Sequence, residues 1–438
     1  MIFSLDVRRA RKGDCLLLHY GPADTPKLAL IDGGPRRVYL PHLRPRLQQI
    51  KQARHLDQDT PLPIDLLMIS HVDEDHVLGI LDLTKELITT SGVPLARIVD
   101  FWHNSFDAVI GHTPDELTAA LSGQFGAAAL SGGLPADATL VDDDDFPGGR
   151  PHEETIQDTL KVLASIEQGH RLRLDADRLH LEPNAHFGGR LVMAEPGGAP
   201  VTIGSGLTFR VIGPMKPELA ALHEMHQEWL QKLQDEGKSP PAALAAYVDP
   251  SVTNLSSIVV VAEAGGKRML LTGDARGDKI LEGLQLAGLL GPGHDSTMHV
   301  HLLKVPHHGS DNNVAPEFFS RITADHYVFS GTGEHGNPER EAVRMLLDAR
   351  GSAPFVAHFT YPIAEIDAAR KKDWERKQAQ EKARKAKKPS VTVRPDWSPA
   401  RNALAAFLDS ITLADGQTIE VITHDTAPHV IDLLDPLT

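Results

Sequence analysis

The sequence has little cysteine, no long apolar run and no excess of positive charge, and each shortage excludes a class of protein. Among 438 residues there is one cysteine, Cys15, so an internal disulfide and a four-cysteine zinc module are both excluded. No stretch approaches 18 apolar residues, so we expect no membrane-spanning helix. The formal net charge of −15 argues against a protein that coats nucleic acid through a general positive field.

The N-terminal segment also lacks the apolar stretch of a signal peptide. It reads M-I-F-S-L-D-V-R-R-A-R-K-G-D, with charges where that stretch would lie, so we expect a protein of the reducing cytoplasm. Hydrophobic residues make up 41% of the chain and charged residues 24%, which is ordinary for a globular protein with a sizeable core. The 23 histidines are numerous, and they invite a search for metal ligands.

Short apolar runs bounded by glycine and charge alternate with helical patterns along most of the chain. This alternation predicts an α/β or α+β protein built in layers. We expect strands at 2–7, 15–20, 28–32, 64–70, 95–102, 201–214, 257–262, 268–272, 301–305 and 326–330. We expect helices at 39–54, from about 77, and at 153–168, 216–236 and 338–349.

Two regions stand apart from this alternation. Residues 115–200 are weakly patterned and include the D-D-D-D run at 142–145, so we interpret them as an insertion. Residues 363–388 predict a helix with ten basic residues, which is either a solvated surface helix with i,i+4 ion pairs or a local contact for an anion or nucleic acid. We therefore divide the chain into a main domain at 1–355 and a C-terminal extension at 356–438.

The segment L-L-M-I-S-H-V-D-E-D-H, residues 66–76, carries the strongest chemical signal. An apolar strand delivers His71 to its end, and the following turn brings Asp73, Asp75 and His76 around the same point. Carboxylates and imidazoles crowded together repel one another and lose hydration unless a cation is present. The pattern therefore predicts a divalent metal site, with zinc, manganese and iron all suited to these ligands. The alternative is a polar capping turn.

H-V-D-E-D-H resembles the H-x-[HD]-x-D-H signature of the metallo-β-lactamase-fold hydrolases, in the variant of the nuclease-like domain of ComEC competence proteins. Further segments follow in that family's order: L-D-V-R-R-A-R-K-G-D-C-L-L-L with L-A-L-I-D-G-G-P, then S-S-I-V-V-V-A-E-A-G-G-K-R-M-L-L-T-G-D-A, then L-L-K-V-P-H-H-G-S. Together they cover most of residues 1–350. The resemblance implies a four-layer αββα sandwich with an insertion and a basic helical C-terminal extension.

The same resemblance implies two divalent ions, zinc or manganese, about 3.5 Å apart, although a single ion is also possible. His71 and Asp73 would hold the first, and Asp75, His76 and either His307 or His308 the second. Asp274 would bridge the two ions, and the resemblance gives Asp75 and Asp274 the catalytic role. One departure is that Thr253 or Asn254 stands where most of the family has a histidine, as Asn and Ser do in the ComEC-like branch.

Several further residues are candidates for substrate contact or for support of the metal ligands. His103 and Asn104 end a predicted strand, and a structural role between loops is an equal alternative for both. Ser310 either donates to a substrate or caps the next helix, and His335 lies where the ComEC-like branch has G-H-P. Asn254 takes the place of the missing histidine.

The resemblance implies a metal-dependent hydrolase that uses a metal-bound hydroxide, and it favours phosphodiester or phosphoester bonds of a nucleic acid or nucleotide. Hydrolysis of another ester or amide class is less favoured. The alternative from a different class is a binding or assembly component with a degenerate or structural metal site. A protein partner would then dock on the insertion or on the C-terminal helix. Neither hypothesis about the function requires a membrane.

Overall fold

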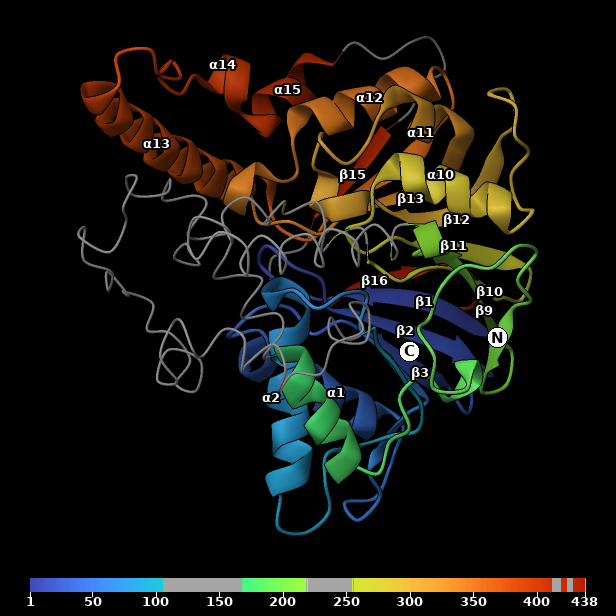
Figure 1. The fold of residues 1–438 in the computed structure, drawn as a ribbon. Coiled ribbons are helices and arrows are strands. Elements are labelled where there is room, and N and C mark those ends of the chain that lie inside the picture. Colours follow the sequence, from blue (N-terminus) through green and yellow to red (C-terminus); the bar gives the residue numbers. More distant parts are fainter. Residues whose placement is uncertain are drawn as a thin grey trace, which may run out of the picture.

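Two β-sheets packed face to face form the centre of the protein (Figure 1). The computed structural model describes residues 1–104, 168–217, 256–411, 419–423 and 428–437, together with Leu219 and Asn254. Apolar side chains from both sheets, such as Leu18 and Leu271, share one buried cluster between them. The predicted sandwich class is therefore confirmed.

The first sheet has six strands in the order β16-β1-β2-β3-β5-β7. Its first four strands run antiparallel, and β5 and β7 continue it in parallel. Every residue of β1 is buried, because the sheet is covered on both faces. The bounds are β1 Ile2–Val7, β2 Leu16–Gly21, β3 Lys27–Ile31, β5 Leu66–Met68, β7 Phe101–Trp102 and β16 His429–Asp432.

The second sheet has eight strands in the order β15-β14-β13-β12-β11-β10-β9-β8. Strands β8 to β11 pair antiparallel, and β11 to β15 pair in parallel. The parallel strands therefore all end at one edge of the sheet, which is where ligands bind in open sheets of this kind. The bounds are β8 Val201–Ile203, β9 Leu207–Gly213, β10 Val259–Ala264, β11 Lys267–Leu271, β12 Met298–Lys304, β13 Ile322–Phe329, β14 Phe355–Phe359 and β15 Ile419–Thr423. A separate pair, β4 Leu62–Ile64 and β6 Ala96–Ile98, lies outside both sheets.

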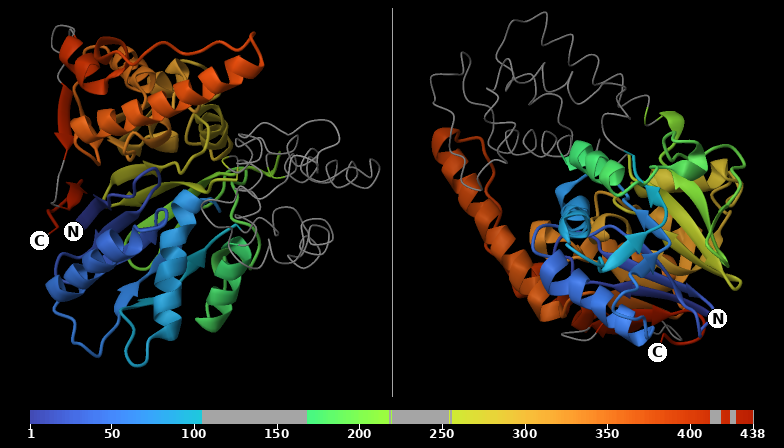
Figure 2. Two further views of the ribbon diagram at one scale, coloured as in Figure 1. Left: turned by 90° about the vertical axis from the view of Figure 1, so that its left-hand side faces the viewer. Right: turned by 90° about the horizontal axis from the view of Figure 1, so that it is seen from below.

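Helices cover the outer face of each sheet and complete the four layers (Figures 1 and 2). On the first sheet these are α1 Arg44–Ala53, α2 Glu74–Thr89 and the helical residues 168–178. On the second they are α10 Gly277–Leu286, α11 Pro316–Arg321, α12 Arg340–Arg350, the start of α13 Ile363–Lys387 and α15 Leu404–Ser410. Each helix packs on its sheet through one apolar face. On α12 this face consists of Ala342, Val343, Leu346 and Leu347, which recur at helical spacing and are buried.

Short helical turns and a few boundaries depart from the predicted elements. The turns are η1 Tyr39–Leu43, η3 Ala185–Phe187, η4 Pro306–Gly309, η5 Glu334–Gly336 and α14 Pro399–Asn402. The predicted strand at 95–102 is two strands, β6 and β7, which belong to different sheets. α2 begins three residues earlier than predicted, because the Asp73 side chain accepts the Glu74 backbone N–H and caps the helix. The predicted helix at 153–168 and most of the one at 216–236 lie outside the described residues. Residues 115–167 of the predicted insertion also lie outside them.

The C-terminal residues 356–438 contribute to both sheets. They supply most of β14, the edge strand β15 of the second sheet, and β16, which pairs with β1 in the first. The predicted basic helix is present as α13, 25 residues long, and it extends well beyond the sandwich (Figure 2). Its predicted i,i+4 ion pairs include Lys371–Glu375 and Lys377–Asp373. Among the described residues, no helix is both long and apolar enough to cross a membrane.

Candidate metal centre

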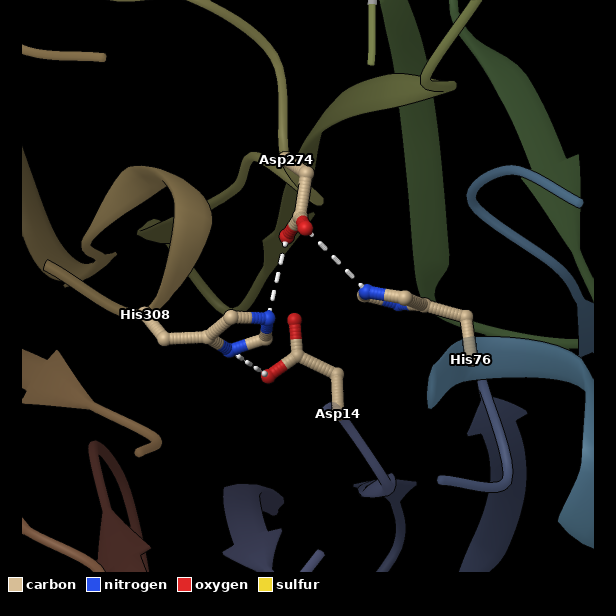
Figure 3. A group of neighbouring side chains, drawn as sticks. All are labelled: Asp14, His76, Asp274 and His308. Atoms are coloured by element: carbon tan, nitrogen blue, oxygen red, sulfur yellow. Dashed lines mark ion pairs between the residues drawn. The ribbon is translucent and has the colours of Figure 1, made fainter. Parts of the chain in front are cut away.

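Four side chains from segments far apart in the sequence meet at one end of the sandwich: Asp14, His76, Asp274 and His308 (Figure 3). Asp14 precedes β2 and His76 lies in the first turn of α2. Asp274 follows β11, and His308 lies in η4, directly after β12. Each side chain is therefore placed by the end of a buried strand or the start of a helix.

The four side chains are buried and close together. Their relative exposures are 1% for Asp14, 0% for His76, 3% for Asp274 and 2% for His308. Asp274 Oδ2 lies 3.4 Å from His76 Nε2, and Asp274 Oδ1 lies 3.3 Å from His308 Nε2. Asp14 Oδ1 lies 3.5 Å from His308 Nδ1. These groups therefore surround a common point that is closed to bulk solvent.

Two more histidines approach the same carboxylate. His307 Nε2 lies 3.7 Å and His71 Nε2 4.0 Å from Asp274 Oδ2. The two oxygens of Asp274 thus face different groups, since His308 lies at Oδ1 and the other three imidazoles lie at Oδ2. A carboxylate in this arrangement is able to link two neighbouring cations.

The hydrogen bonds of the imidazole Nδ1 atoms direct Nε2 toward Asp274. His76 Nδ1 lies 2.8 Å from Asp32 Oδ2 and donates to it, while His308 Nδ1 lies 3.0 Å from Ser330 Oγ. His307 Nδ1 lies 2.8 Å from the Asn313 Oδ1 atom, which only accepts. A proton held at Nδ1 leaves the lone pair of a neutral ring on Nε2, which is how metal-binding histidines are oriented in proteins.

Asp32 is the anchor behind His76. Its carboxylate accepts from the Ser70 backbone N–H at 2.7 Å and from the Ser70 hydroxyl at 2.6 Å. The Ser70 hydroxyl also lies 3.1 Å from His71 Nδ1. One buried aspartate and one serine therefore fix the orientation of two imidazoles in the centre.

The backbone of η4 holds the two consecutive histidines in an uncommon conformation. His307 has φ 47° and His308 has φ 56°, which places both in the left-handed region that non-glycine residues seldom occupy. Such residues cluster at functional sites, where the surrounding structure holds them in place. The turn lets adjacent rings approach Asp274 from two sides, with His308 buried and His307 30% exposed.

The chemistry of the donor set fits divalent ions. Five buried polar atoms of this cluster have no hydrogen-bond partner: Asp14 Oδ1, His71 Nε2, His76 Nε2, Asp274 Oδ1 and His308 Nε2. Buried polar atoms are normally paired, so a group of unpaired ones calls for an ion or water between them. Mixed imidazole and carboxylate ligands suit zinc, manganese or iron.

The charges in the cluster shift the pKa values of its histidines in opposite directions. Burial lowers the pKa of His308, but the Asp274 and Asp14 carboxylates outweigh burial and raise it to about 9. The pKa of His76 is raised well above its usual value, because Asp274 and Asp32 likewise outweigh burial. Burial together with the neighbouring charge of His76 lowers the pKa of His71 to about 3.

These shifts predict that metal binding releases protons. With these raised pKa values, His76 and His308 both carry a second ring proton at pH 7 in the metal-free protein. An imidazole that binds a metal must give up the proton on its coordinating nitrogen. We expect about two protons released per centre filled at pH 7, and an affinity that still rises as the pH increases above 7. Zinc titration by calorimetry in buffers of different ionisation enthalpy measures the number. Release of no protons at pH 7 would contradict the assignment of these two ligands.

The two adjacent histidines differ enough in environment to predict different losses on substitution. His308 is buried and shares the cluster with Asp14, whereas His307 is partly exposed. We expect His308→Ala to lower zinc affinity at least about 100-fold, and His307→Ala by about tenfold. Competition with a chromophoric chelator measures both, with His294→Ala, 88% exposed on the surface, as the control. Equal losses for the two variants would show that burial does not rank these ligands.

The structure brings five of the predicted site residues together around one point. His71, His76, Asp274, His307 and His308 come together around the centre. Asn254 lies beside them, with its Nδ2 atom 3.3 Å from His307 Nδ1.

The two predicted aspartates of α2 lie next to the centre. Asp73 caps α2, and burial together with the nearby Asp75 raises its pKa to about 7. Burial opposes ionisation of Asp75, but the charges of His76 and Lys12 lower its pKa overall. A metal-ligand role for either residue stays a prediction.

Among the secondary candidates, His103 and Asn104 connect loops, and His335 lies on the surface. Asn104 exchanges hydrogen bonds with the Val192 backbone, and His103 does so through its own backbone with Asn184, which matches the structural alternative. Ser310 does not cap α11, whose N-cap is Ala315, so that interpretation is wrong. His335 is exposed in η5, and its backbone oxygen accepts from Lys377.

Sequence reasoning missed three charged residues of the centre. Asp14 and Asp32 stand inside the motifs G-D-C and D-G-G-P, each at one end of an apolar run, but were not chosen as site residues. Lys304 lies within the apolar run L-L-K-V-P and is fully buried. A lysine inside an apolar run is itself a sign of a site, because burying an ammonium group requires a partner.

A second group of possible ligands lies at the other end of β12. His299, His301 and Asp325 are within reach of one another, but they are exposed or half-buried. His301 Nδ1 already accepts the Arg268 backbone N–H, and His299 is paired with Asp325. No group of unpaired buried atoms lies there, so the buried cluster is the better candidate in the described part of the chain.

Comparison with known proteins adds no identification. No protein-family model matches the chain, and no curated protein matches it. Conclusions about function therefore rest on the sequence motifs and on the geometry of the centre.

Proposed function

We propose that the protein is a metal-dependent hydrolase of the metallo-β-lactamase fold, in its ComEC-like branch, acting on phosphodiester or phosphoester bonds. The observation that carries the proposal is the convergence of five unpaired buried ligand atoms on one end of the sandwich. The ordered motifs of the sequence fall at that same end. A fold alone does not fix the substrate, so the bond class depends on further features of the site.

The residues of the centre have distinct parts in this proposal. Asp274, His71, His76, His307 and His308 would hold one or two divalent ions, with Asp14 as an additional oxygen ligand. Such ions would activate a water molecule and polarise the scissile bond. Asp32, Ser70, Ser330 and Asn313 orient the imidazole rings through Nδ1. The partly exposed His307 marks the side from which a substrate reaches the centre.

Three features support a phosphate-bearing substrate. The ligand set contains two carboxylates, Asp274 and Asp14, and the resemblance is to a nuclease-like domain. In addition, α13 starts beside the loop that supports the centre: Arg370 donates to the Gly336 backbone, and Asn337 donates to the His307 backbone. The basic residues further along α13 would attract a nucleic acid or nucleotide toward that loop.

Hydrolysis of bis(p-nitrophenyl) phosphate tests the proposal directly. We expect turnover with zinc or manganese, loss with chelator, and loss of at least about 1,000-fold in the variants Asp75→Ala and His76→Ala. Asp278→Ala is the control, because Asp278 is 51% exposed and pairs with Arg276 outside the centre. Turnover of p-nitrophenyl acetate or a β-lactam, with none of the phosphodiester, would reassign the bond class.

One observation favours the alternative of a binding or assembly component. The four central side chains are nearly inaccessible to solvent, as in structural metal sites that are closed to substrate. In that case His76→Ala lowers thermal stability and no ester or phosphodiester is hydrolysed. Retained folding with lost turnover supports the hydrolase.

A further inference from the structure

A buried lysine lies inside the metal centre. The Lys304 side chain is fully buried, and its Nζ atom lies 2.5 Å from Asp14 Oδ2 and 3.8 Å from Asp274 Oδ1. It also donates to the Gly273 backbone oxygen at 3.0 Å. The ammonium group thus contacts both carboxylates of the buried cluster and the backbone that carries one of them.

The position of this charge cannot be explained by packing alone. Lys304 stands between the buried residues Leu303 and Val305 at the end of β12, where an apolar side chain would cost less to bury. Its backbone oxygen accepts from the Thr272 hydroxyl, which ties β12 to the turn before Asp274. The strand therefore presents a positive charge to the carboxylates at a fixed place.

The ammonium group also determines how Asp14 is presented. Because Oδ2 of Asp14 is held by Lys304, the other oxygen, Oδ1, is left buried and without a hydrogen-bond partner. Oδ1 is the atom that lies beside His308. It lies 3.5 Å from Nδ1 of that ring, so Lys304 fixes the Asp14 carboxylate between itself and His308.

We propose that Lys304 is a resident cation of the centre: it balances Asp14 and Asp274 in the metal-free protein and holds the Asp14 carboxylate in place. The proposal rests on the proposed function only in that the centre binds divalent ions. It makes Lys304 a positioning residue, since it acts through the two aspartates.

The sign of its effect on metal binding follows from charge. An ammonium group and a divalent ion that share two carboxylates repel each other, and the repulsion is strong where water is excluded. Without the ammonium, the carboxylates of the metal-free centre have less positive charge to balance them, which makes them more costly to bury. Added metal compensates them. The loss of Lys304 should therefore make the protein less stable without metal and more dependent on metal.

Thermal unfolding of the full chain with chelator or with zinc tests this prediction. Lys304→Met keeps the length of the side chain and removes its charge. We expect a lower melting temperature in chelator, a larger rise on adding zinc than in the wild type, and a zinc affinity on the order of tenfold tighter. Lys304→Arg, which keeps the charge, should restore most of the wild-type behaviour.

Arg46→Met is the matched control. Arg46 of α1 pairs at 2.6 Å with the buried carboxylate of Asp6 in β1, in the first sheet, whereas Lys304 lies in the second sheet. Loss of this charge should lower the melting temperature equally with and without zinc. A rise on adding zinc in Lys304→Met that is no larger than in the wild type and in Arg46→Met overturns the proposal.

Two further variants keep the test decisive if Lys304→Met does not fold. Asp14→Asn leaves the ammonium uncompensated and removes a ligand, so the rise on adding zinc should shrink. Asp14→Asn combined with Lys304→Met removes both charges, and its rise should exceed that of Asp14→Asn alone. Equal rises in these two variants overturn the proposal. The readout is binding and stability, so absence of hydrolysis counts against the proposed function alone.

Discussion

Asp274→Asn is expected to abolish metal binding while the protein stays folded. Asp274 is the side chain on which the centre converges, with four imidazole Nε2 atoms within 4.0 Å of its carboxylate. Removal of an outer partner of a metal ligand costs about 10- to 100-fold in affinity, so replacing the shared ligand should cost at least about 100-fold. Elemental analysis after dialysis, counting zinc, manganese and iron per chain, measures the effect.

Asparagine is the suitable replacement because it keeps the size of the side chain. The backbone of Asp274 is held independently by the Asn313 side chain, so the turn after β11 should keep its shape. The charge of Asp274 is one cause of the raised pKa of His308, which should fall from about 9 toward its usual value in the variant. Asp278→Asn, on the surface of α10, is the control and should bind metal as the wild type does. A variant of Asp274 that still binds two ions would refute the bridging role.

The local part of this site could be predicted from the sequence. His71, Asp274 and the histidine pair at 307–308 each follow an apolar run, and polar residues at the ends of buried strands are a sign of a site. The pattern shows which residues stand at strand ends, but it gives no distances between them. The choice between His307 and His308 depended on burial, which only the packed structure supplies.

The missed residues depend on contacts between distant segments. In the sequence, Lys304 looks like an ordinary residue of a strand. Its partner Asp14 lies near the start of the chain, far from it in sequence. The edge strands β15 and β16 were likewise missed, because they are short and gain their stability by pairing with β14 and β1. Such pairings are set by tertiary packing, which a pattern within one short segment does not encode.

The centre is held in place by close contact between loops as much as by hydrogen bonds. The Gly33 backbone N–H donates to the His76 backbone oxygen at 2.7 Å, and Gly79 N–H donates to the Gly34 oxygen at 2.9 Å. The turn that carries Asp32 therefore lies directly against α2. The loop that carries Asp14 also makes a close contact with that helix, between Gly13 and Asp75.

Gly13→Ala is expected to damage both stability and metal binding. A Cβ atom at position 13 would lie 1.7 Å from the Asp75 backbone oxygen and 2.6 Å from its carbonyl carbon, distances at which the backbone must move. Overpacking in a core costs about 1–3 kcal/mol, and a clash with backbone should reach about 3 kcal/mol or more. The movement would separate Asp14 from His76, so we also expect a metal affinity at least about tenfold lower.

Denaturant unfolding with chelator and zinc titration measure the two effects separately. Gly293→Ala is the matched control, because a Cβ atom there meets no other atom within 4 Å. It should change the free energy of unfolding by less than about 1 kcal/mol and leave zinc affinity unchanged. Wild-type affinity in a destabilised Gly13→Ala variant would mean that Asp14 contributes little to the centre. Since Asp14 is one of the four side chains that meet there, that result would leave Asp274 and the histidines as the whole ligand set.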